Sequence, residues 1–300
     1  LLLSLFPFLV VSRLLIQCPE SDLLALPFRL AAWGIGIRRP CAARVLCIGF
    51  LGGFAPAASA AAQAVRTGQL TAEEADALLP ACICSGPSFV VLTVGQSMLG
   101  SAELGVLLFA AQITANYLTA ALLNRFAGVH SVEQESAAPA SPAPPRLDEI
   151  LADAAITYCK LCGFILFFRL LAAGAGALLP TGAGTLCAIL LEVCSGCDLA
   201  SRTGRWGSLL CCAALSVQGL SVLLQVRTIC PAEMTLHPLY RARILHLPLS
   251  LALFYLLLPG GEADVFSTLP ARVLLMRRVP PDCALLVFAV CCCINSKTLL

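Results

Sequence analysis

Charged residues are scarce in this sequence. Only 12% of its 300 residues are charged, against roughly a quarter in soluble globular domains. Lysine occurs only at Lys160 and Lys297, and the formal net charge is +2. The sequence has no basic patch interleaved with aromatic residues, the usual mark of a nucleic-acid surface. We therefore expect no nucleic-acid partner.

The sequence motifs of several enzyme classes are also missing. There is no GxxxxGK[ST] phosphate loop, no HExxH zinc helix and no GxSxG nucleophile turn. These absences argue against an ATP-driven pump and against an intramembrane metalloprotease. No serine stands out as paired with a histidine or lysine, so the chain is not expected to be an enzyme.

Cysteine is plentiful, but its placement does not predict a metal site. Most of the 17 cysteines lie in apolar runs, and two CxxC pairs occur, Cys159/Cys162 and Cys194/Cys197. The three histidines do not complete a ligand set beside either pair. Buried free cysteine acts as a small apolar residue. We therefore expect no metal, no cofactor and no disulfide framework.

Apolar residues dominate instead. They make up 59% of the chain, the mean hydropathy is +0.90, and several windows exceed the roughly 20 residues that cross a membrane. The sequence predicts an all-α, polytopic integral membrane helical bundle, multi-pass in the cell membrane and in contact with membrane lipid. Arginine is present in nearly every loop, so the charge distribution does not fix the orientation.

The apolar runs are interrupted by glycine, proline and polar residues, at 52–56, 85–87, 191–197 and 216–225. Such breaks free backbone groups that lipid cannot satisfy, so they persist only inside protein or beside a watery cavity. They predict broken or re-entrant helices around a solute site. Simple kinks are the alternative reading at 52–56 and 85–87.

The apolar segments fall into two halves. A Pro/Ala/Ser-rich linker at 127–147 divides a first membrane half, 1–126, from a second, 148–258, and a tail with a short apolar segment follows at 259–300. Each half has a span, a small-residue break, a Ser-Gly break and a polar-faced helix. This plan is compatible with two structural repeats; two unrelated helical halves are the alternative.

Local signals place several helices. Thr71 and Glu74 form a capping box at the start of a short helix. The span 102–123 carries Gln112, Asn116 and Thr119 on one helical face. Further apolar segments are expected at 1–17, 41–65, 80–99, 156–179, 186–200, 206–229 and 244–258, with interfacial segments at 19–40 and 231–243.

Glu192 is the leading candidate for a functional residue. A carboxylate at mid-bilayer costs about 2.5–3.5 kcal/mol on insertion scales, so such a residue usually has a functional role or a charged partner. Ser195 and Gly196 follow on the same face if the segment is helical. Glu192 would bind a cation, a proton or a polar solute; the alternative is a structural ion pair with Lys160 or Arg169.

Three further polar residues have helical spacing. Gln218, Ser221 and Gln225 would form one hydrogen-bonding stripe on a helix, lining a solute path or bonding helix to helix. With the Ser-Gly breaks they complete the predicted solute-binding set: Ser85, Gly86, Glu192, Ser195, Gly196, Gln218, Ser221 and Gln225.

The order of the breaks carries a resemblance. In the first half the residues are Phe6-Pro7-Phe8, Gly52-Gly53-Phe54-Ala55-Pro56, Arg66-Thr67-Gly68-Gln69-Leu70-Thr71, Glu74-Ala75 and Ser85-Gly86-Pro87-Ser88-Phe89. In the second they are Gly163-Phe164-Ile165-Leu166-Phe167, Leu191-Glu192, Ser195-Gly196, Gly219-Leu220-Ser221-Val222, Gln225 and Arg243-Ile244-Leu245-His246. As an ensemble, to about Leu258, this order resembles the sporulation integral membrane protein family of YlbJ type.

That family is similar to the wider nucleoside-recognition, or Gate, domain group, which includes parts of concentrative nucleoside transporters and the membrane region of ferrous-iron transport protein B. The resemblance implies an endospore-forming bacterium, the cell membrane and a role in making resistant spores. It does not imply a substrate.

The expected function is transport or gating of a small polar solute or ion across the membrane during spore formation. The alternative is a non-transporting membrane scaffold for spore envelope assembly. A membrane enzyme would need a general base near one of the serine-containing breaks. Further partners left open are a second copy of the chain and other sporulation membrane proteins.

Overall fold

The computed structural model describes residues 2–17, 22–128 and 147–258, and throughout these ranges the regular structure is helical. The expected all-α fold with broken helices is confirmed. The linker predicted at 127–147 lies outside the described residues except at its ends, and the tail 259–300, with its short apolar segment, lies wholly outside them.

The first half contains two helix breaks. It comprises α1 (Leu2–Gln17), α2 (Asp22–Ile35), α3 (Pro40–Gly52), α4 (Phe54–Arg66), α5 (Ala72–Cys82), the π-helix η2 (Ser88–Met98) and α6 (Ala102–Ala127). One break separates α3 from α4 at Gly53, and the other separates α5 from η2 at residues 83–87.

The second half has the same order of elements. It comprises α7 (Leu147–Leu178), α8 (Thr181–Leu191), α9 (Val193–Ser201), the short 3₁₀ turn η3 (Gly204–Trp206), α10 (Gly207–Val217), α11 (Gly219–Ile229) and α12 (His237–Leu257). Its breaks lie at Glu192 and Gln218. Each half is thus a helix, two broken helices and a closing helix, with α2 extra in the first.

Helix ends follow local capping chemistry. The predicted capping box is confirmed: Thr71 Oγ1 accepts from the Glu74 amide at 3.1 Å, and Glu74 accepts from the Thr71 amide at 2.9 Å. Ser101 caps α6 with its hydroxyl alone, which accepts from the Leu104 amide at 3.2 Å, and Gly128 closes α6 in the left-handed conformation. Local residues thus satisfy part of the free backbone groups at these ends.

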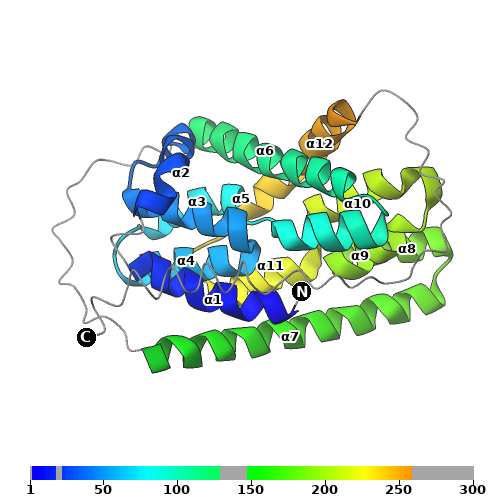
Figure 1. Ribbon diagram of the computed structural model, residues 1–300, viewed down its shortest axis with the longest axis horizontal. Helices are drawn as coiled ribbons and strands as arrows, with labels where there is room; N and C mark the ends of the chain where they lie inside the picture. Colours follow the sequence, from blue (N-terminus) through cyan, green and yellow to red (C-terminus); the bar gives the residue numbers. More distant parts are fainter. Residues whose placement is uncertain (1, 18–21, 129–146, 259–300) are drawn as a thin grey trace.

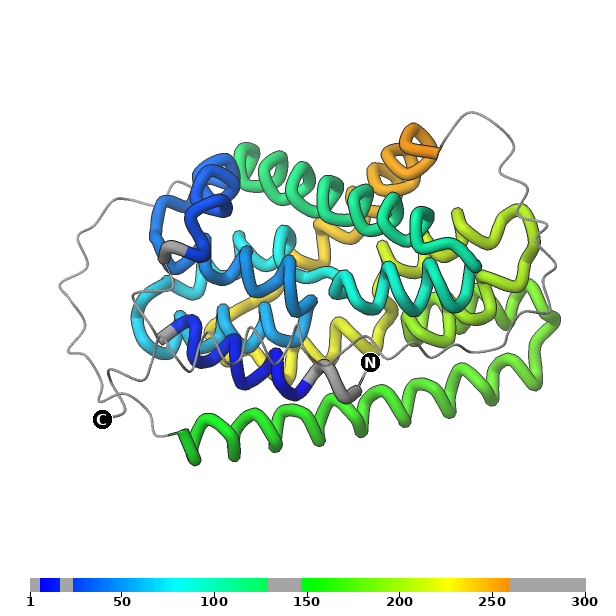
Figure 2. Tube along the Cα trace, viewed as in Figure 1, coloured from blue at the N-terminus to red at the C-terminus, as the bar shows by residue number. Residues whose placement is uncertain are grey.

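The first helices of the two halves, α1 and α7, lie side by side and run in opposite directions (Figure 1 and Figure 2). Phe6, early in α1, stacks edge-on against Tyr158 with ring centroids 5.8 Å apart. Arg13, late in α1, pairs with Asp153 at 2.7 Å, earlier in α7 than Tyr158. The residue order is reversed between the two helices, so the pair is antiparallel.

The closing helices α6 and α12 are antiparallel as well. Gln112 of α6 contacts His246 of α12, and the later residue Asn116 contacts the earlier residue Arg243. Both pairs of equivalent helices therefore run in opposite directions. This is the relation that inverted-topology repeats give to the halves of a membrane protein.

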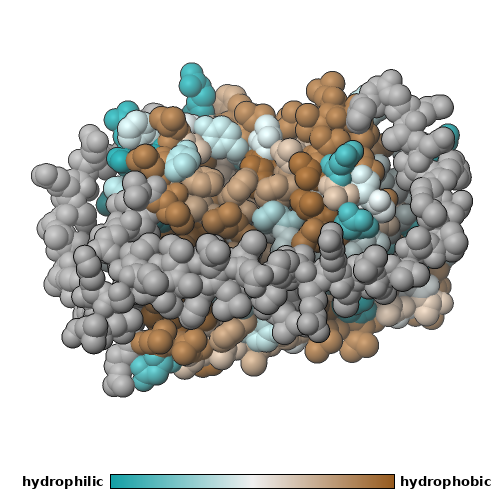
Figure 3. All heavy atoms as spheres, in the orientation of Figure 1, coloured by the Kyte–Doolittle hydropathy of each residue, from teal (hydrophilic) through white to brown (hydrophobic). Residues whose placement is uncertain are grey.

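The exterior is strongly apolar. Among the described residues, three stretches, Ala102–Ala127, Leu147–Leu178 and Gly204–Ile229, are long and apolar enough to cross a membrane, and five shorter apolar helices accompany them. Large apolar side chains are exposed on α7 and α12, for example Leu170 at 73% and Ile244 at 74%. Figure 3 shows apolar areas on the outer face, a surface suited to lipid contact.

One predicted boundary is wrong. Residues 231–243 were expected to lie at the interface and 244–258 to form a separate helix, but α12 runs unbroken from His237 to Leu257. The reason is that Arg243 does not stay at the interface. Its side chain turns into the protein, and the residue is only 8% exposed.

Candidate solute site

The two breaks of the first half cross each other at glycine. Gly53 has φ +83°, and a Cβ there would be 2.7 Å from the main-chain nitrogen of Gly86. A Cβ on Gly86 would in turn meet the carbonyl carbon of Gly52 at 3.4 Å. The backbones thus touch directly where α3–α4 passes α5–η2, which places the predicted site residue Gly86 in this contact and Ser85 beside it.

The two breaks of the second half cross in the same way. Gly219 has φ +72°, and a Cβ there would be 2.9 Å from the Glu192 main-chain nitrogen and from the Leu191 carbonyl. The α8–α9 break therefore passes the α10–α11 break at backbone contact. Gly196, one turn into α9, has a separate packing role, because a Cβ there would lie 2.8 Å from Ile189 Cα in α8.

Glu192 caps α9. Its carboxylate accepts hydrogen bonds from the Cys194 amide at 2.8 Å, the Ser195 amide at 2.7 Å and the Ser195 hydroxyl at 2.8 Å. These amides belong to the first turn of α9, where they would otherwise lack partners. Glu192 is 2% exposed, so the carboxylate is buried together with the donors that satisfy it.

The alternative reading of Glu192 as half of an ion pair does not fit this geometry. Within the described ranges no lysine or arginine lies at ion-pair distance from it. Lys160 and Arg169 both lie on exposed positions of α7. The amides at the start of α9, which is the positive end of the helix dipole, satisfy the Glu192 carboxylate in place of a basic side chain.

Gln218 links the two crossings. It adopts the left-handed conformation between α10 and α11, with φ +62°, and its Nε2 donates to the carbonyl of Ile83 at 3.2 Å. Ile83 belongs to the break between α5 and η2, whose carbonyl is released because α5 ends at Cys82. A side chain from the second-half break thus satisfies a main-chain group freed in the first-half break.

The predicted stripe of Gln218, Ser221 and Gln225 is therefore wrong as a single helical face. The helix is interrupted at Gln218, so only Ser221 and Gln225 lie on α11, where Gln225 Nε2 donates to Ser221 Oγ at 2.8 Å. All three residues are about 1% exposed. Their role in solute binding stays a prediction.

Arg243 is the principal residue that sequence reasoning left out of the site. Its Nη2 donates to the Ile83 carbonyl at 2.7 Å, and its Nη1 lies 3.4 Å from Asn116 Oδ1 and 3.5 Å from the Ser216 carbonyl. No carboxylate among the described residues lies at ion-pair distance from it. A buried guanidinium is thus held by carbonyl and amide oxygens alone.

A second group of side chains extends this network between α6, α10 and α12. Gln112 Nε2 donates to Ser216 Oγ at 2.9 Å, Ser216 contacts Ser250, and His246 Nε2 lies 3.3 Å from the Gln112 carbonyl. Arg243, His246 and Ser250 share one face of α12 at spacings of three and four. That spacing within an apolar run was the signal that could have found them.

Several atoms of these buried side chains have no partner within the described part of the chain: Gln218 Oε1, Gln225 Oε1, Arg243 Nε and His246 Nδ1. Both donors and acceptors are among them. Buried polar atoms in proteins are nearly always bonded to protein or to ordered water. The region therefore retains unused capacity to hydrogen-bond water or a small polar molecule.

Two cavities of the described structure lie elsewhere. One, of about 160 Å³, lies between α1, α4, α7 and α11; the other, of about 620 Å³, lies between α2 and α6. None of the eight predicted site residues lines either cavity. The residues of the central polar network line neither of these two cavities.

Metal ligation has no candidate cluster within the described ranges, where no three His, Cys, Asp or Glu residues come together. In the first CxxC pair Cys159 is exposed on α7 and Cys162 half-buried. In the second, Cys197 is buried, and its carbonyl accepts from the Cys211 thiol at 3.5 Å. Both pairs lie within helices.

The fold and the site define an all-α helical protein of two halves whose first helices and closing helices run antiparallel, each half containing two broken helices that cross. No protein-family model, no curated protein and no solved structure matches this chain.

Proposed function

We propose that the chain is a multi-pass protein of the cell membrane that transports or gates a small polar solute or ion. The observation that carries this proposal is the meeting of four helix breaks, two from each half, linked by the contact of Gln218 with the Ile83 carbonyl. In membrane proteins built from inverted repeats, broken helices at the interface between the halves form the solute site.

The side chains at the meeting point of the four helix breaks support a polar solute. Arg243 and Gln218 both bond the Ile83 carbonyl and both keep one side-chain atom without a partner. An entering solute would compete for these groups, and any movement of one half against the other would have to break the same contacts. The network is in this proposal both a binding site and a gate.

Glu192 has a supporting role in the same proposal. Its carboxylate fixes the start of α9 at the second crossing, so a solute or ion bound at Glu192 would compete with those amides for the carboxylate. Binding of a charged solute at Glu192 would thus be coupled to the position of α9. The proposal requires no enzymatic step.

The placement in sporulation rests on the resemblance to the YlbJ-type family. The placement in a membrane is supported by the three long apolar stretches and by the exposed apolar residues of α7. The partners in this proposal are lipid, the solute or ion, and a second copy or other sporulation membrane proteins.

The proposal is tested by measuring small-solute content in spores made with and without the protein. Spores carrying Arg243→Gln should resemble spores without it, because the guanidinium contacts at Ile83 are lost. Ile244→Ala, at the next and 74% exposed position, is the matched control and should leave the content unchanged. Equal solute content in spores with and without the protein would contradict transport.

One observation favours the second candidate, a non-transporting scaffold for envelope assembly. Glu192, Gln218, Ser221 and Gln225 are each only 1–2% exposed, and Glu192 is fully used by its own helix. A scaffold requires these residues only for packing. It predicts that Arg243→Gln changes the protein's abundance and spore morphology together, with solute content following abundance.

A further inference from the structure

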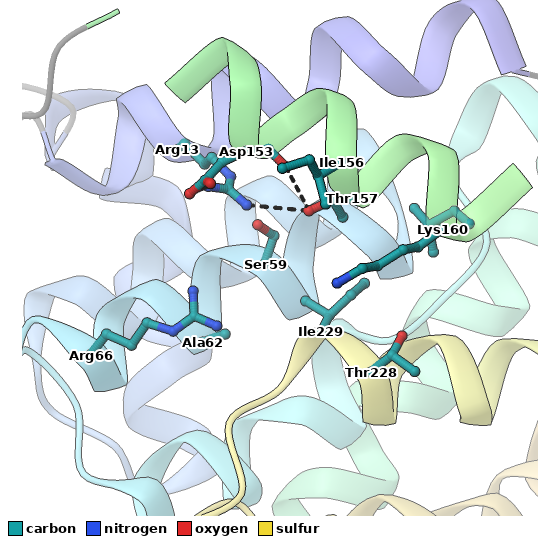
Figure 4. Close-up of a pocket in the computed structure, with 11 residues that line it drawn as sticks. Arg13, Ser59, Ala62, Arg66, Asp153, Ile156, Thr157, Lys160, Thr228 and Ile229 are labelled. Carbon is teal, nitrogen blue, oxygen red and sulfur yellow. Dashed lines mark hydrogen bonds and ion pairs between the residues drawn. The ribbon is translucent and has the colours of Figure 1, made fainter. Parts of the chain in front are cut away.

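A second polar region, away from the helix crossings, lies in the cavity of about 160 Å³ between α1, α4, α7 and α11. Figure 4 shows its lining residues converging from these helices. Arg66 stands in the last turn of α4 and Thr228 near the end of α11, whereas Asp153 lies in the second turn of α7. The cavity is therefore at the end of the bundle where α4 and α11 finish and α7 begins.

The lining is cationic. Arg13, Arg66 and Lys160 come from three different helices, and Asp153 is the one carboxylate that lines the cavity with them. Arg13 is engaged, with Asp153 at 2.7 Å and Thr157 at 3.3 Å. Three cations against one anion leave an excess of two positive charges.

The two other cations are free to bind. Arg66 and Lys160 have no hydrogen-bond or ion-pair partner in the described part of the chain, and both are exposed. In Figure 4 the Lys160 amine reaches from α7 toward Ile229, and the Arg66 guanidinium lies on the α4 side. The hydroxyls of Ser59 and Thr228 line the same space.

We propose that this cavity binds a phosphate group, carried either by an anionic phospholipid or by free phosphate. Arginine and lysine are the usual ligands of phosphate oxygens, arginine through its planar fork and lysine as a point charge. Basic pockets between membrane helices bind anionic headgroups. The Ser59 hydroxyl adds a neutral donor to a remaining oxygen, whereas the Thr228 hydroxyl already donates to the Gln225 carbonyl at 2.8 Å.

The site is independent of the proposed transport function. None of the residues that join the helix crossings lines this cavity. A phosphate bound here would bridge α4 to α7, and therefore tie the first half to the second, without entering the central network.

The test uses the purified full chain in nanodiscs of phosphatidylcholine, with phosphatidylglycerol as the lipid probe and inorganic phosphate as the free probe. The variant Arg66→Gln/Lys160→Gln removes the two free cations. The matched control, Arg125→Gln/Arg169→Gln, removes the same charge at exposed positions outside the cavity. Circular dichroism and melting in phosphatidylcholine alone establish that all three proteins are folded.

Wild type and control should bind a probe, and the double variant should bind it about 25-fold more weakly, at roughly fivefold for each cation. If the double variant binds only phosphatidylglycerol more weakly than wild type does, the ligand is a lipid headgroup. If it binds only inorganic phosphate more weakly, measured in phosphatidylcholine nanodiscs, the ligand is free phosphate. Equal binding of both probes by the double variant and wild type, or binding of neither by wild type, would overturn the proposal.

Discussion

The two crossings of broken helices differ in how they accommodate the free amides at a buried helix start. At both, a helix starts inside the protein and leaves amides without helical partners. At the second crossing the Glu192 carboxylate accepts hydrogen bonds from two of these amides. At the first, the equivalent cap is Gly53, which has no side chain, and Pro56 removes an amide altogether. Both crossings thus depend on close backbone packing, and the second adds a buried charge.

The comparison predicts the largest effect at the first crossing. Gly53→Ala places a Cβ 2.7 Å from Gly86 nitrogen at φ +83° and ψ −165°, a region almost restricted to glycine. Strain and overpacking should together lower the free energy of unfolding by about 3 kcal/mol or more, measured as a fall in the melting midpoint in detergent.

Gly68→Ala is its control, because Gly68 has φ +71° but nothing within 4 Å of an added Cβ. It should cost about 1–2 kcal/mol from the backbone alone. Equal losses at Gly53 and Gly68 would show that the contact between the breaks contributes nothing.

The next effect is expected at Glu192. Glu192→Ala leaves two buried amides and the Ser195 hydroxyl without their acceptor, which should cost about 2–3 kcal/mol in the same melting measurement. Glu192→Asp, whose shorter carboxylate can still cap a helix, should recover most of the loss. If Glu192→Gln is as stable as wild type, the charge is not needed for capping.

A smaller effect is expected at Ser195, whose hydroxyl donates to Glu192 at 2.8 Å. Ser195→Ala removes one hydrogen bond and should cost about 1 kcal/mol. In the Glu192→Ala background the same substitution should cost less, because the acceptor is gone. Melting midpoints of the four proteins form the double-mutant cycle, and strict additivity would contradict the coupling.

The smallest effect is expected at Gln218. Gln218→Gly removes the bond to the Ile83 carbonyl, worth about 1 kcal/mol, but also relieves a left-handed residue at φ +62°, worth about as much. The melting midpoint should therefore hardly move. A loss above about 2 kcal/mol would show that Gln218 holds the two crossings together.

Sequence reasoning located the breaks but not their partners. Glycine, proline and buried polar residues mark where a helix ends, and these are local signals; that Gly53 meets Gly86, or that Gln218 reaches Ile83, depends on contacts between distant segments. The charge of Arg243 suggested an interface, since an isolated arginine in an apolar run usually reaches for water. The carbonyls freed at the breaks, together with Asn116 Oδ1, give it a buried alternative.

The length of α7 has a consequence for how the protein sits in its membrane. Its 32 residues extend about 48 Å at 1.5 Å per residue, well beyond a hydrocarbon layer of about 30 Å. The helix must tilt or project from the bilayer. Lys160 is 13 residues after Leu147, about 20 Å along the axis, so the angle that α7 takes determines the depth of the cationic cavity relative to the bilayer surface.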